Sequence, residues 1–310
     1  MLLTHGACDA TLPPVALTIG NFDGIHRGHQ AMLERLVDEA RKRALVGCVL
    51  TFEPHPREFF APRSAPTRLA SLREKFELLA AHKVERVHVQ RFTGSFAALE
   101  PEAFVERVLA KRLKARWLLI GEDFRFGAKR AGDLALLKGL AGRYGYEVEI
   151  MPAVTRAGAR VSSSAVRTAL ASGDLASAEA LLGRPYSISG RVVHGRKLGR
   201  KLGFATANVQ LNHNRPPLTG IYAVRVRGIG AARSGVASLG VRPTITASGR
   251  AVLEVHLFDF SDDLYAAHVT VEFLHKIRDE EKYSDLDELK AQIARDCEAA
   301  KGFLLEHRNA

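Results

Sequence analysis

Two stretches of the sequence contain residue types that could bind phosphate. The first runs from Gly20 to His29 (GNFDGIHRGH), and the second from Gly195 to Asn208 (GRKLGRKLGFATAN). In the first stretch, His26 lies three positions before His29, a spacing that puts both rings on one face at a helix start. Their N–H groups could donate hydrogen bonds to a phosphate whose negative charge grows during a reaction. Two such stretches, about 180 residues apart, indicate two separate phosphate-handling sites.

The second stretch combines glycines with basic residues and ends in two oxygen-bearing side chains. Gly195, Gly199 and Gly203 recur at every fourth position, which gives a flexible basic loop able to wrap a triphosphate. Thr206 and Asn208 lie at alternate positions, so on a strand their oxygens face the same way and could coordinate Mg²⁺ between phosphates. Taken alone, the glycine loop is equally compatible with a solvated hairpin.

Hydrophobic periodicity predicts the elements that position the first stretch. Short apolar runs alternate with amphipathic stretches, and this β-α rhythm predicts an α/β domain with a parallel sheet covered by helices on both faces. Ligands of such sheets bind beyond the carboxyl ends of the strands. The expected strands are 15–20, 45–52, 86–89, 116–121 and 146–151, and the expected helices are 28–43, 71–83, 101–114 and 133–143.

The second half has a different pattern. Two short helices are expected at 164–171 and 174–182, and a boundary follows that divides a domain 1–183 from a domain 184–310. Beyond it, closely spaced strands with glycine and proline turns predict a small antiparallel β-barrel, followed by one long terminal helix at 285–305. The expected barrel strands are 187–193, 207–211, 222–227, 235–239, 252–258 and 268–273.

Composition limits the class of protein. The chain has 310 residues, of which 46% are hydrophobic, enough for two buried cores. Its start lacks the pattern of a signal peptide, and no apolar run reaches the length of a membrane span. Cys8, Cys48 and Cys297 are far apart, which fits neither a disulfide framework nor a metal site. We therefore expect a cytoplasmic protein with no membrane partner.

The positive charge is unevenly distributed. The net charge is +11, and the segment from Ala180 to Leu253 contains twelve Arg and Lys residues but no acid, whereas fourteen acids and seven bases follow from Glu254 onward. This distribution favours a pocket for polyphosphate over a basic surface facing solvent. The aromatic-interleaved basic motifs of RNA-binding proteins are absent from the sequence, so we expect no nucleic-acid partner.

Four motifs in the first half resemble, in order and spacing, the adenylyltransferase half of the bacterial bifunctional riboflavin kinase/FAD synthetase family. They are GNFDGIHRGH, then EPHP at 53–56, GEDFRFG at 121–127 and VSSSAVR at 161–167. The resemblance implies a Rossmann-like nucleotidyltransferase fold, with His26 and His29 as catalytic residues and Arg167 holding the leaving pyrophosphate. It implies ATP-binding roles for Gly20, Asn21, Phe22, Asp23, Gly24, Ser163 and Ser164, and flavin-binding roles for Asp123 and Phe126.

Motifs in the second half resemble the riboflavin kinase half of the same family. They are GRVVHG at 190–195, GRKLGFATAN at 199–208, GIY at 220–222, GVRPT at 240–244, EVHLFDF at 254–260, DLY at 263–265 and FLHKIRDEEKY at 273–283. The resemblance implies that Gly195, Gly199 and Gly203 bind ATP and that Thr206 and Asn208 bind magnesium. It also implies that Glu254 is the general base and that Arg278 holds flavin.

Two positions depart from the family pattern. Ala205 stands where the family usually has proline, and Ser238 replaces the usual asparagine. Because Thr206 and Asn208 are present, the resemblance still implies kinase activity.

The expected function is flavin cofactor synthesis. The barrel would phosphorylate riboflavin to FMN with ATP, and the first domain would adenylylate FMN to FAD with a second ATP, both with Mg²⁺. FAD would then be a product of this transferase and not a redox cofactor. Two alternatives stay open at this point: a nucleotidyltransferase for another phosphate ester with a non-catalytic barrel, and a basic nucleic-acid-binding protein.

Overall fold

The computed structural model describes residues 1–6, 11–156, 158–194, 203–211, 215–242 and 250–307. Contacts between residues divide the chain into two units. The first consists of Met1–Pro66 and Leu72–Ser162, and the second of Thr67–Ser71 and Ser163–Ala310. The two short helices after residue 162 therefore group with the barrel by contacts, and the functional boundary at 183/184 stays a prediction.

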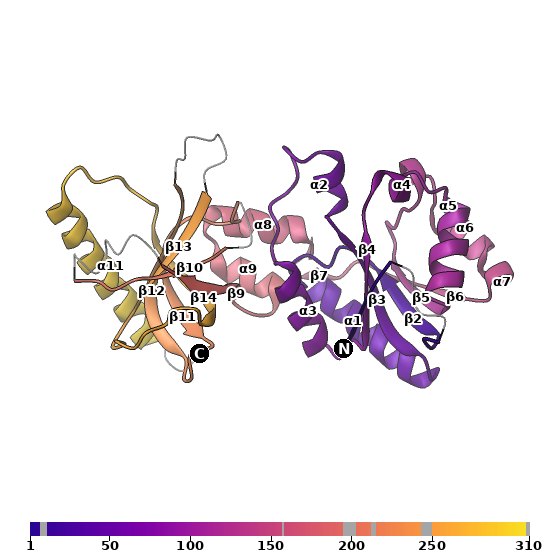
Figure 1. Cartoon of the computed structure of the whole chain (residues 1–310), viewed down its shortest axis with the longest axis horizontal. Coiled ribbons are helices and arrows are strands. Elements are labelled where there is room, and N and C mark those ends of the chain that lie inside the picture. The colour runs from indigo at the N-terminus through magenta and orange to yellow at the C-terminus, as the bar shows by residue number, and fades with distance from the viewer. Residues whose placement is uncertain (7–10, 157, 195–202, 212–214, 243–249, 308–310) are drawn as a thin grey trace. The chain divides into compact units, whose positions relative to one another are not determined.

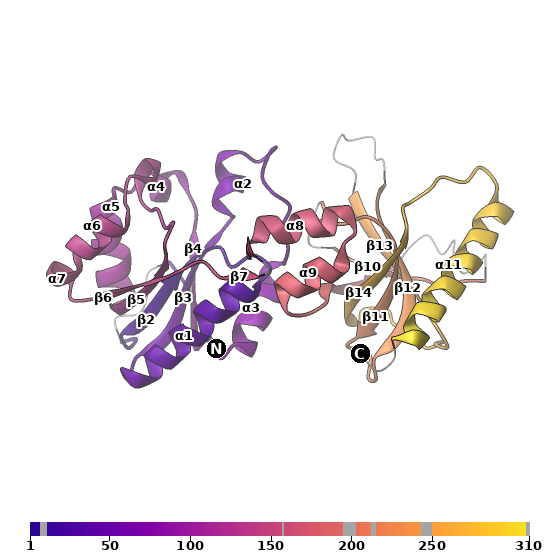
Figure 2. The same ribbon diagram turned by 180° about the vertical axis from the view of Figure 1, so that it is seen from behind.

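The first unit is a six-stranded parallel sheet with helices on both faces (Figures 1 and 2), which confirms the predicted α/β class. Its strand order is β1-β4-β3-β2-β5-β6. The strands are β1 (Leu2–His5), β2 (Val15–Ile19), β3 (Val46–Glu53), β4 (Arg86–Arg91), β5 (Ala115–Gly121) and β6 (Glu147–Met151). The helices are α1 (Arg27–Lys42), α2 (Pro56–Phe60), α3 (Leu72–Ala81), α4 (Gly94–Ala97), α5 (Pro101–Phe104), α6 (Leu134–Gly139) and α7 (Ala141–Tyr144).

Strand β2 lies at the centre of this unit and is buried along its whole length. Val15 and Leu17 pack into one core together with Val108, whereas Ala16 faces a second core together with Leu33 of α1. Alternate side chains thus contribute to opposite layers, which is why the strand is one continuous apolar run. Its carboxyl end leads directly into the turn that carries the first phosphate-binding stretch.

Several local features differ from the expectation. The helix expected at 101–114 is α5 followed by a π-helix (Val105–Arg112), and the one expected at 133–143 is divided into α6 and α7. Periodicity over so few residues does not distinguish π from α geometry. Strand β1 was not predicted, because it is an exposed edge strand that pairs only with β4. A short hairpin of β7 (Thr155–Arg156) and β8 (Ala159–Arg160) was missed as well.

The second unit is a closed antiparallel barrel followed by a long helix, as predicted (Figure 1). Around the barrel the strand order is β10-β13-β12-β11-β14-β9. The strands are β9 (Tyr186–Val193), β10 (Ala207–Val209), β11 (Gly220–Arg227), β12 (Arg233–Arg242), β13 (Arg250–Leu257) and β14 (His268–Arg278); the helices are α8 (Ser163–Ser172), α9 (Leu175–Leu182) and α11 (Leu286–Glu306).

Alternation along the barrel strands separates an inner from an outer layer. On β11, Tyr222 and Val224 belong to the barrel core, whereas Ile221 belongs to a smaller cluster with Cys297 and Ala300 of α11. Helix α11 therefore covers one side of the barrel, while outward residues on the other strands remain available for polar chemistry. Within the part of the chain that the structure describes, no helix is both long and apolar enough for a membrane crossing.

Candidate active sites

The turn between β2 and α1 has an unusual backbone. Phe22 and Ile25 adopt φ angles of 47° and 42°, and Gly24 adopts 81°. For large side chains this conformation costs on the order of 1–3 kcal/mol each. The side chains of Phe22 and Ile25 are 1% and 0% exposed and pack with Leu33 of α1. Their burial offsets the backbone cost and holds the turn in one shape.

The residues predicted to bind ATP from Gly20 to Gly24 form this turn. Asp23 is buried, and the Asn21 side-chain oxygen Oδ1 is buried without a hydrogen-bond partner among the described residues. The Thr51 hydroxyl of β3 donates to the Asn21 carbonyl over 3.3 Å. An unsatisfied buried acceptor costs about 1–3 kcal/mol, so a ligand with a hydrogen-bond donor would be stabilised at this turn.

His26 is the N-cap of α1. Its ring Nδ1 accepts a hydrogen bond from the His29 backbone N–H at 3.3 Å. In the neutral ring the proton is therefore on Nε2, which can donate to a ligand. The two imidazoles are stacked, with centroids 3.7 Å apart and planes 15° apart. A Cβ at Gly28 would lie 3.2 Å from His26 Nδ1, so glycine gives the His26 ring room to lie over the helix start.

His29 is held in its neutral form. Burial, then the neighbouring His26, then the ammonium of Lys75 lower its pKa well below the ordinary value. Lys75 of α3 is 5% exposed, and its Nζ lies 3.4 Å from the Thr51 hydroxyl. The His29 Nδ1 atom is buried and lacks a hydrogen-bond partner among the described residues. Lys75 was not predicted as a site residue, because a lysine on an amphipathic helix normally faces solvent.

The histidine pair opens onto a pocket of about 450 Å³. Its wall includes Gly121 and Met151, the last residues of β5 and β6, so the pocket lies where ligands of parallel sheets bind. Asp123, predicted to bind flavin, lies on the same wall, where its carboxylate is 2.6 Å from the Arg160 guanidinium. The pocket wall also includes Glu122, and Arg160 is paired with Asp123, so the imidazoles are the donors that suit a phosphorylated ligand here.

Phe126, also predicted to bind flavin, is 6% exposed and packs against Phe104 and Phe124. The ring is enclosed further by Gly132, where a Cβ would lie 2.7 Å from the Phe126 side chain. Phe59 and Phe60 of α2 are 39% and 67% exposed, which makes them the more accessible aromatic rings. Stacking of flavin on Phe126 stays a prediction.

Ser163, Ser164 and Arg167 lie on α8, which groups with the second unit. Arg167 Nε donates to the Thr67 carbonyl at 2.5 Å. The helix begins at Ser163, one residue earlier than expected, and Ser162 before it lines the histidine pocket. The roles of the three α8 residues in ATP binding stay predictions.

The register of the barrel brings candidate kinase residues together. Asn208 of β10 is directly opposite Glu254 of β13, and Glu254 is opposite Ser238 of β12. Directly opposite residues have Cβ atoms about 5 Å apart. Around the outer face, one row of neighbouring positions runs through Val193, Asn208, Glu254, Ser238, Ile221 and Arg278. The direct pairing of Asn208 with Glu254 was not predictable from the sequence, because the two residues are 46 positions apart.

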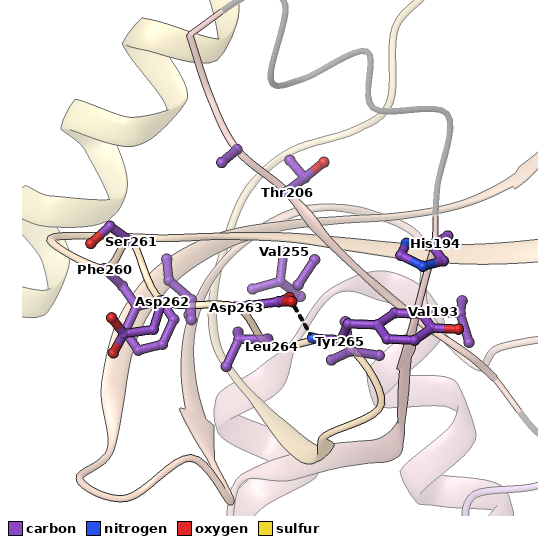
Figure 3. A pocket seen from close by; sticks show the side chains of 14 residues that line it. Val193, His194, Thr206, Val255, Phe260, Ser261, Asp262, Asp263, Leu264 and Tyr265 are labelled. Carbon is purple, nitrogen blue, oxygen red and sulfur yellow. Dashed lines mark hydrogen bonds between the residues drawn. The ribbon is translucent and has the colours of Figure 1, made fainter.

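Thr206, just before β10, lines a second pocket of about 610 Å³ (Figure 3). His194 and Tyr265 stack on its wall, with ring centroids 3.8 Å apart and planes 14° apart. Tyr265 is 53% exposed, and its backbone N–H donates to the Asp263 carboxylate at 2.9 Å. Flat aromatic faces of this kind provide a surface on which a nucleobase can stack.

Of the glycines predicted to bind ATP in this unit, Gly203 is exposed with φ at 90°, and a Cβ there would meet no atom within 4 Å. Gly195 and Gly199 lie outside the described residues.

Arg278, predicted to hold flavin, forms a bidentate ion pair. Its Nε and Nη2 donate to the Asp296 carboxylate of α11 at 2.8 and 2.7 Å, and Nη1 donates to the Asp279 carbonyl at 2.9 Å. Asp296 is 4% exposed, and its hydrogen bonds raise the pKa of Arg278. The observed contacts tie the end of β14 to α11, and contact with flavin stays a prediction.

The segment after β14 also reaches the outer row. Ser238 donates its hydroxyl to the Glu280 carboxylate at 3.2 Å. A Cβ at Gly240 would overlap that carboxylate, so glycine leaves the space that Glu280 occupies. Ser238, a departure from the family pattern, thus has a defined partner beside Glu254.

Comparisons with known proteins match both halves of the chain. The FAD synthetase family model matches residues 8–165, and the riboflavin kinase family model matches residues 182–304. The bifunctional riboflavin kinase/FMN adenylyltransferase of Escherichia coli K12 is 49% identical over 300 residues, covering 96% of each chain. The protein of the same name from Haemophilus influenzae is 48% identical over 306 residues, covering 98% of this chain and 99% of the relative.

A solved structure from Streptococcus pneumoniae, described as a macrolide-efflux protein, has the same two-part fold. It aligns with a TM-score of 0.81 at 30% identity, and the alignment covers 96% of this chain and 97% of that one.

The proximity of Lys75 to His29 gives a first prediction. Lys75→Met removes one of the causes that lower the His29 pKa, so the pKa should rise, while burial and His26 should keep it below the ordinary value of about 6.5. In an NMR titration, His29 should then take up its proton at a higher pH than in the parent chain.

Arg73→Met is the matched control, because Arg73 is on the same helix but is 61% exposed and paired with Glu77. It should leave the His29 titration unchanged. An unaltered His29 pKa in folded Lys75→Met would contradict the electrostatic role given to Lys75.

Proposed function

The chain belongs to the family of bifunctional riboflavin kinase/FMN adenylyltransferases, and on this basis we propose which residues carry each reaction. The C-terminal part phosphorylates riboflavin to FMN, and the N-terminal part converts FMN to FAD. Family matches to both halves leave no support for a non-catalytic barrel or for a protein that only binds nucleic acid.

For the adenylyl transfer, we propose the histidine pocket as the reaction site. A phosphate oxygen of FMN attacks the α-phosphorus of ATP, and the bond from that phosphorus to pyrophosphate breaks. His26 donates through Nε2, and His29 provides a second neutral donor to the α-phosphate as charge develops. The observation that carries this proposal is the stacked His26–His29 pair in the wall of a pocket beyond the strand ends.

For the phosphoryl transfer, we propose that Glu254 accepts the proton of the riboflavin 5′-hydroxyl. The hydroxyl oxygen then attacks the γ-phosphorus, and ADP leaves. Phosphoryl transfer needs positioning, charge neutralisation and one proton acceptor. The pairing of Glu254 with Asn208 across β13 and β10 supports this assignment, and the pocket lined by Thr206 is the proposed ATP site.

We propose that Thr206 and Asn208 contribute the protein ligands of the magnesium ion that enters with ATP. Neutral oxygen donors suit Mg²⁺, which usually keeps several waters and takes its remaining ligands from phosphates. Among the described residues there is no cluster of three or more His, Cys, Asp or Glu side chains able to hold a metal. The two neutral oxygens of Thr206 and Asn208 fit a metal that arrives with the nucleotide. Magnesium held by these residues would neutralise charge on the transferred phosphate.

A cytoplasmic location is part of the same proposal. Both reactions consume ATP, and the two cysteines in the described part of the chain, Cys48 and Cys297, are buried as free thiols. Burial raises the pKa of Cys297 to about 11, which keeps it in the unreactive thiol form.

The two reactions should be separable by mutation. His29→Ala should lower FAD formation by about 10²-fold or more, because a donor to the reacting phosphate is lost. Riboflavin phosphorylation should stay within about twofold of the parent rate. Chromatography of products from riboflavin, ATP and Mg²⁺ would show FMN accumulating without FAD. Equal loss of both products in a folded variant would argue against separate sites.

Glu254→Gln tests the proposed base. The amide keeps the shape and hydrogen-bonding reach of the side chain but cannot accept the proton, so riboflavin phosphorylation should fall by about 10²-fold or more. FAD formation from supplied FMN should continue. Glu272→Gln, on another outer-face strand position and paired with Arg227, serves as control and should retain kinase activity. A near-parental kinase rate in Glu254→Gln would move the base to another residue.

A further inference from the structure

The backbone before Thr206 is fixed by a side chain from a different strand. The Ala205 carbonyl and the Thr206 N–H belong to one planar peptide group, so a contact that orients the carbonyl also orients the start of Thr206. The ring Nδ1 of His256 lies 2.8 Å from that carbonyl oxygen. His256 is on β13, 50 positions along the chain from Thr206.

The chemistry of this contact fixes the protonation of one ring nitrogen. A carbonyl oxygen can only accept, so His256 Nδ1 carries a proton and donates. Both the neutral Nδ1–H tautomer and the doubly protonated ring have this proton, so the hydrogen bond persists in either state.

The His256 ring is held by aromatic packing on two sides. It makes edge-to-face contacts with Phe204, at 5.5 Å and 88°, and with Phe258, at 5.9 Å and 75°. Phe258 is 8% exposed and belongs to the cluster that packs against Cys297 of α11. The imidazole is thus a donor held in a fixed position, which lowers the entropic cost of keeping the hydrogen bond.

His256 is also placed relative to the proposed base. It follows Glu254 by two positions on the same strand, so both side chains face the same side. Strand β13 pairs with β10, with Ala207 opposite Val255 and Asn208 opposite Glu254. One strand therefore supplies both the proposed base and the donor that holds the segment carrying Thr206.

We propose that His256 is a positioning residue of the kinase reaction, which orients the peptide between Ala205 and Thr206 so that Thr206 and Asn208 meet Mg-ATP together. It does not contact the reacting atoms. The proposal rests on the role proposed above for Thr206. Alanine at 205 leaves the φ angle of that residue free, whereas proline would restrict it, so in this chain the hydrogen bond to the Ala205 carbonyl constrains a segment that lacks the proline restraint.

Two substitutions separate the hydrogen bond from the packing of the ring. His256→Phe keeps the aromatic contacts and loses the donor, so the KM for Mg-ATP in riboflavin phosphorylation should rise about fivefold to tenfold, the effect of one neutral hydrogen bond. The kcat should change by less than about threefold, because chemistry at Glu254 is untouched. His256→Asn places an amide N–H near the position of Nδ1 and should restore the KM to within about threefold of the parent chain.

His275→Phe is the matched control. His275 is an exposed histidine of the same barrel that stacks on Phe303 of α11, with centroids 4.5 Å apart. Replacing it by phenylalanine should leave the KM for Mg-ATP unchanged. FAD formation from supplied FMN should be the same in all the variants.

The outcomes discriminate between roles. A parental KM in His256→Phe would overturn the proposal, as would a His256→Asn variant as impaired as His256→Phe, because ring packing alone would then explain the effect. Thr206→Ala should itself impair Mg-ATP use. If Thr206→Ala keeps the parental KM for Mg-ATP, the role proposed for Thr206 is wrong, whatever the His256 variants show. Failure of the proposed magnesium site can therefore be distinguished from failure of the positioning role of His256.

Discussion

The alternation of side chains across a strand is the constraint on which both sites depend. In the first unit, both faces of the sheet are covered, so every residue of β2 is buried and polar chemistry is confined to the strand ends. In the barrel, inward side chains fill the interior, which leaves outward positions for chemistry. Closure fixes the register of all six strands, so Asn208 and Glu254 must be neighbours.

The two sites differ in the charged groups that surround the reacting phosphate. Near the histidine pair, burial first, then His26, then the buried ammonium of Lys75 lower the pKa of His29 and keep it neutral. In the barrel, the proposed base is a carboxylate that must work beside a triphosphate and is repelled by it. The segment from Ala180 to Leu253 contains no acid, so the carboxylates near the base and the pocket, those of Asp262, Asp263 and Glu280, all come from the part of the chain that follows Glu254. The twelve Arg and Lys residues of the acid-free segment would offset part of this repulsion.

The order and type of the main elements were predictable, because each apolar run or stripe reports which faces an element buries. The features that were missed depend on tertiary contacts. Nothing in the local sequence distinguishes Lys75 from a surface lysine, or shows that His256 reaches the Ala205 carbonyl. The ion pair of Arg278 with Asp296, 18 residues away, was likewise not predicted, and the flavin contact that the resemblance implies for Arg278 stays a prediction.

Under the roles proposed for Glu254, Asn208 and Arg278, the outer row of the barrel also indicates where the two substrates of the kinase would meet. At one end, Val193 lines the pocket proposed for ATP. At the other, Ser238 is bound by Glu280, and Ile221 is packed in the cluster under α11. Asn208 and Glu254 occupy the positions in between. A phosphate donor seated in the pocket and an acceptor held near Arg278 would thus approach each other at the two residues proposed to bind the metal and remove the proton.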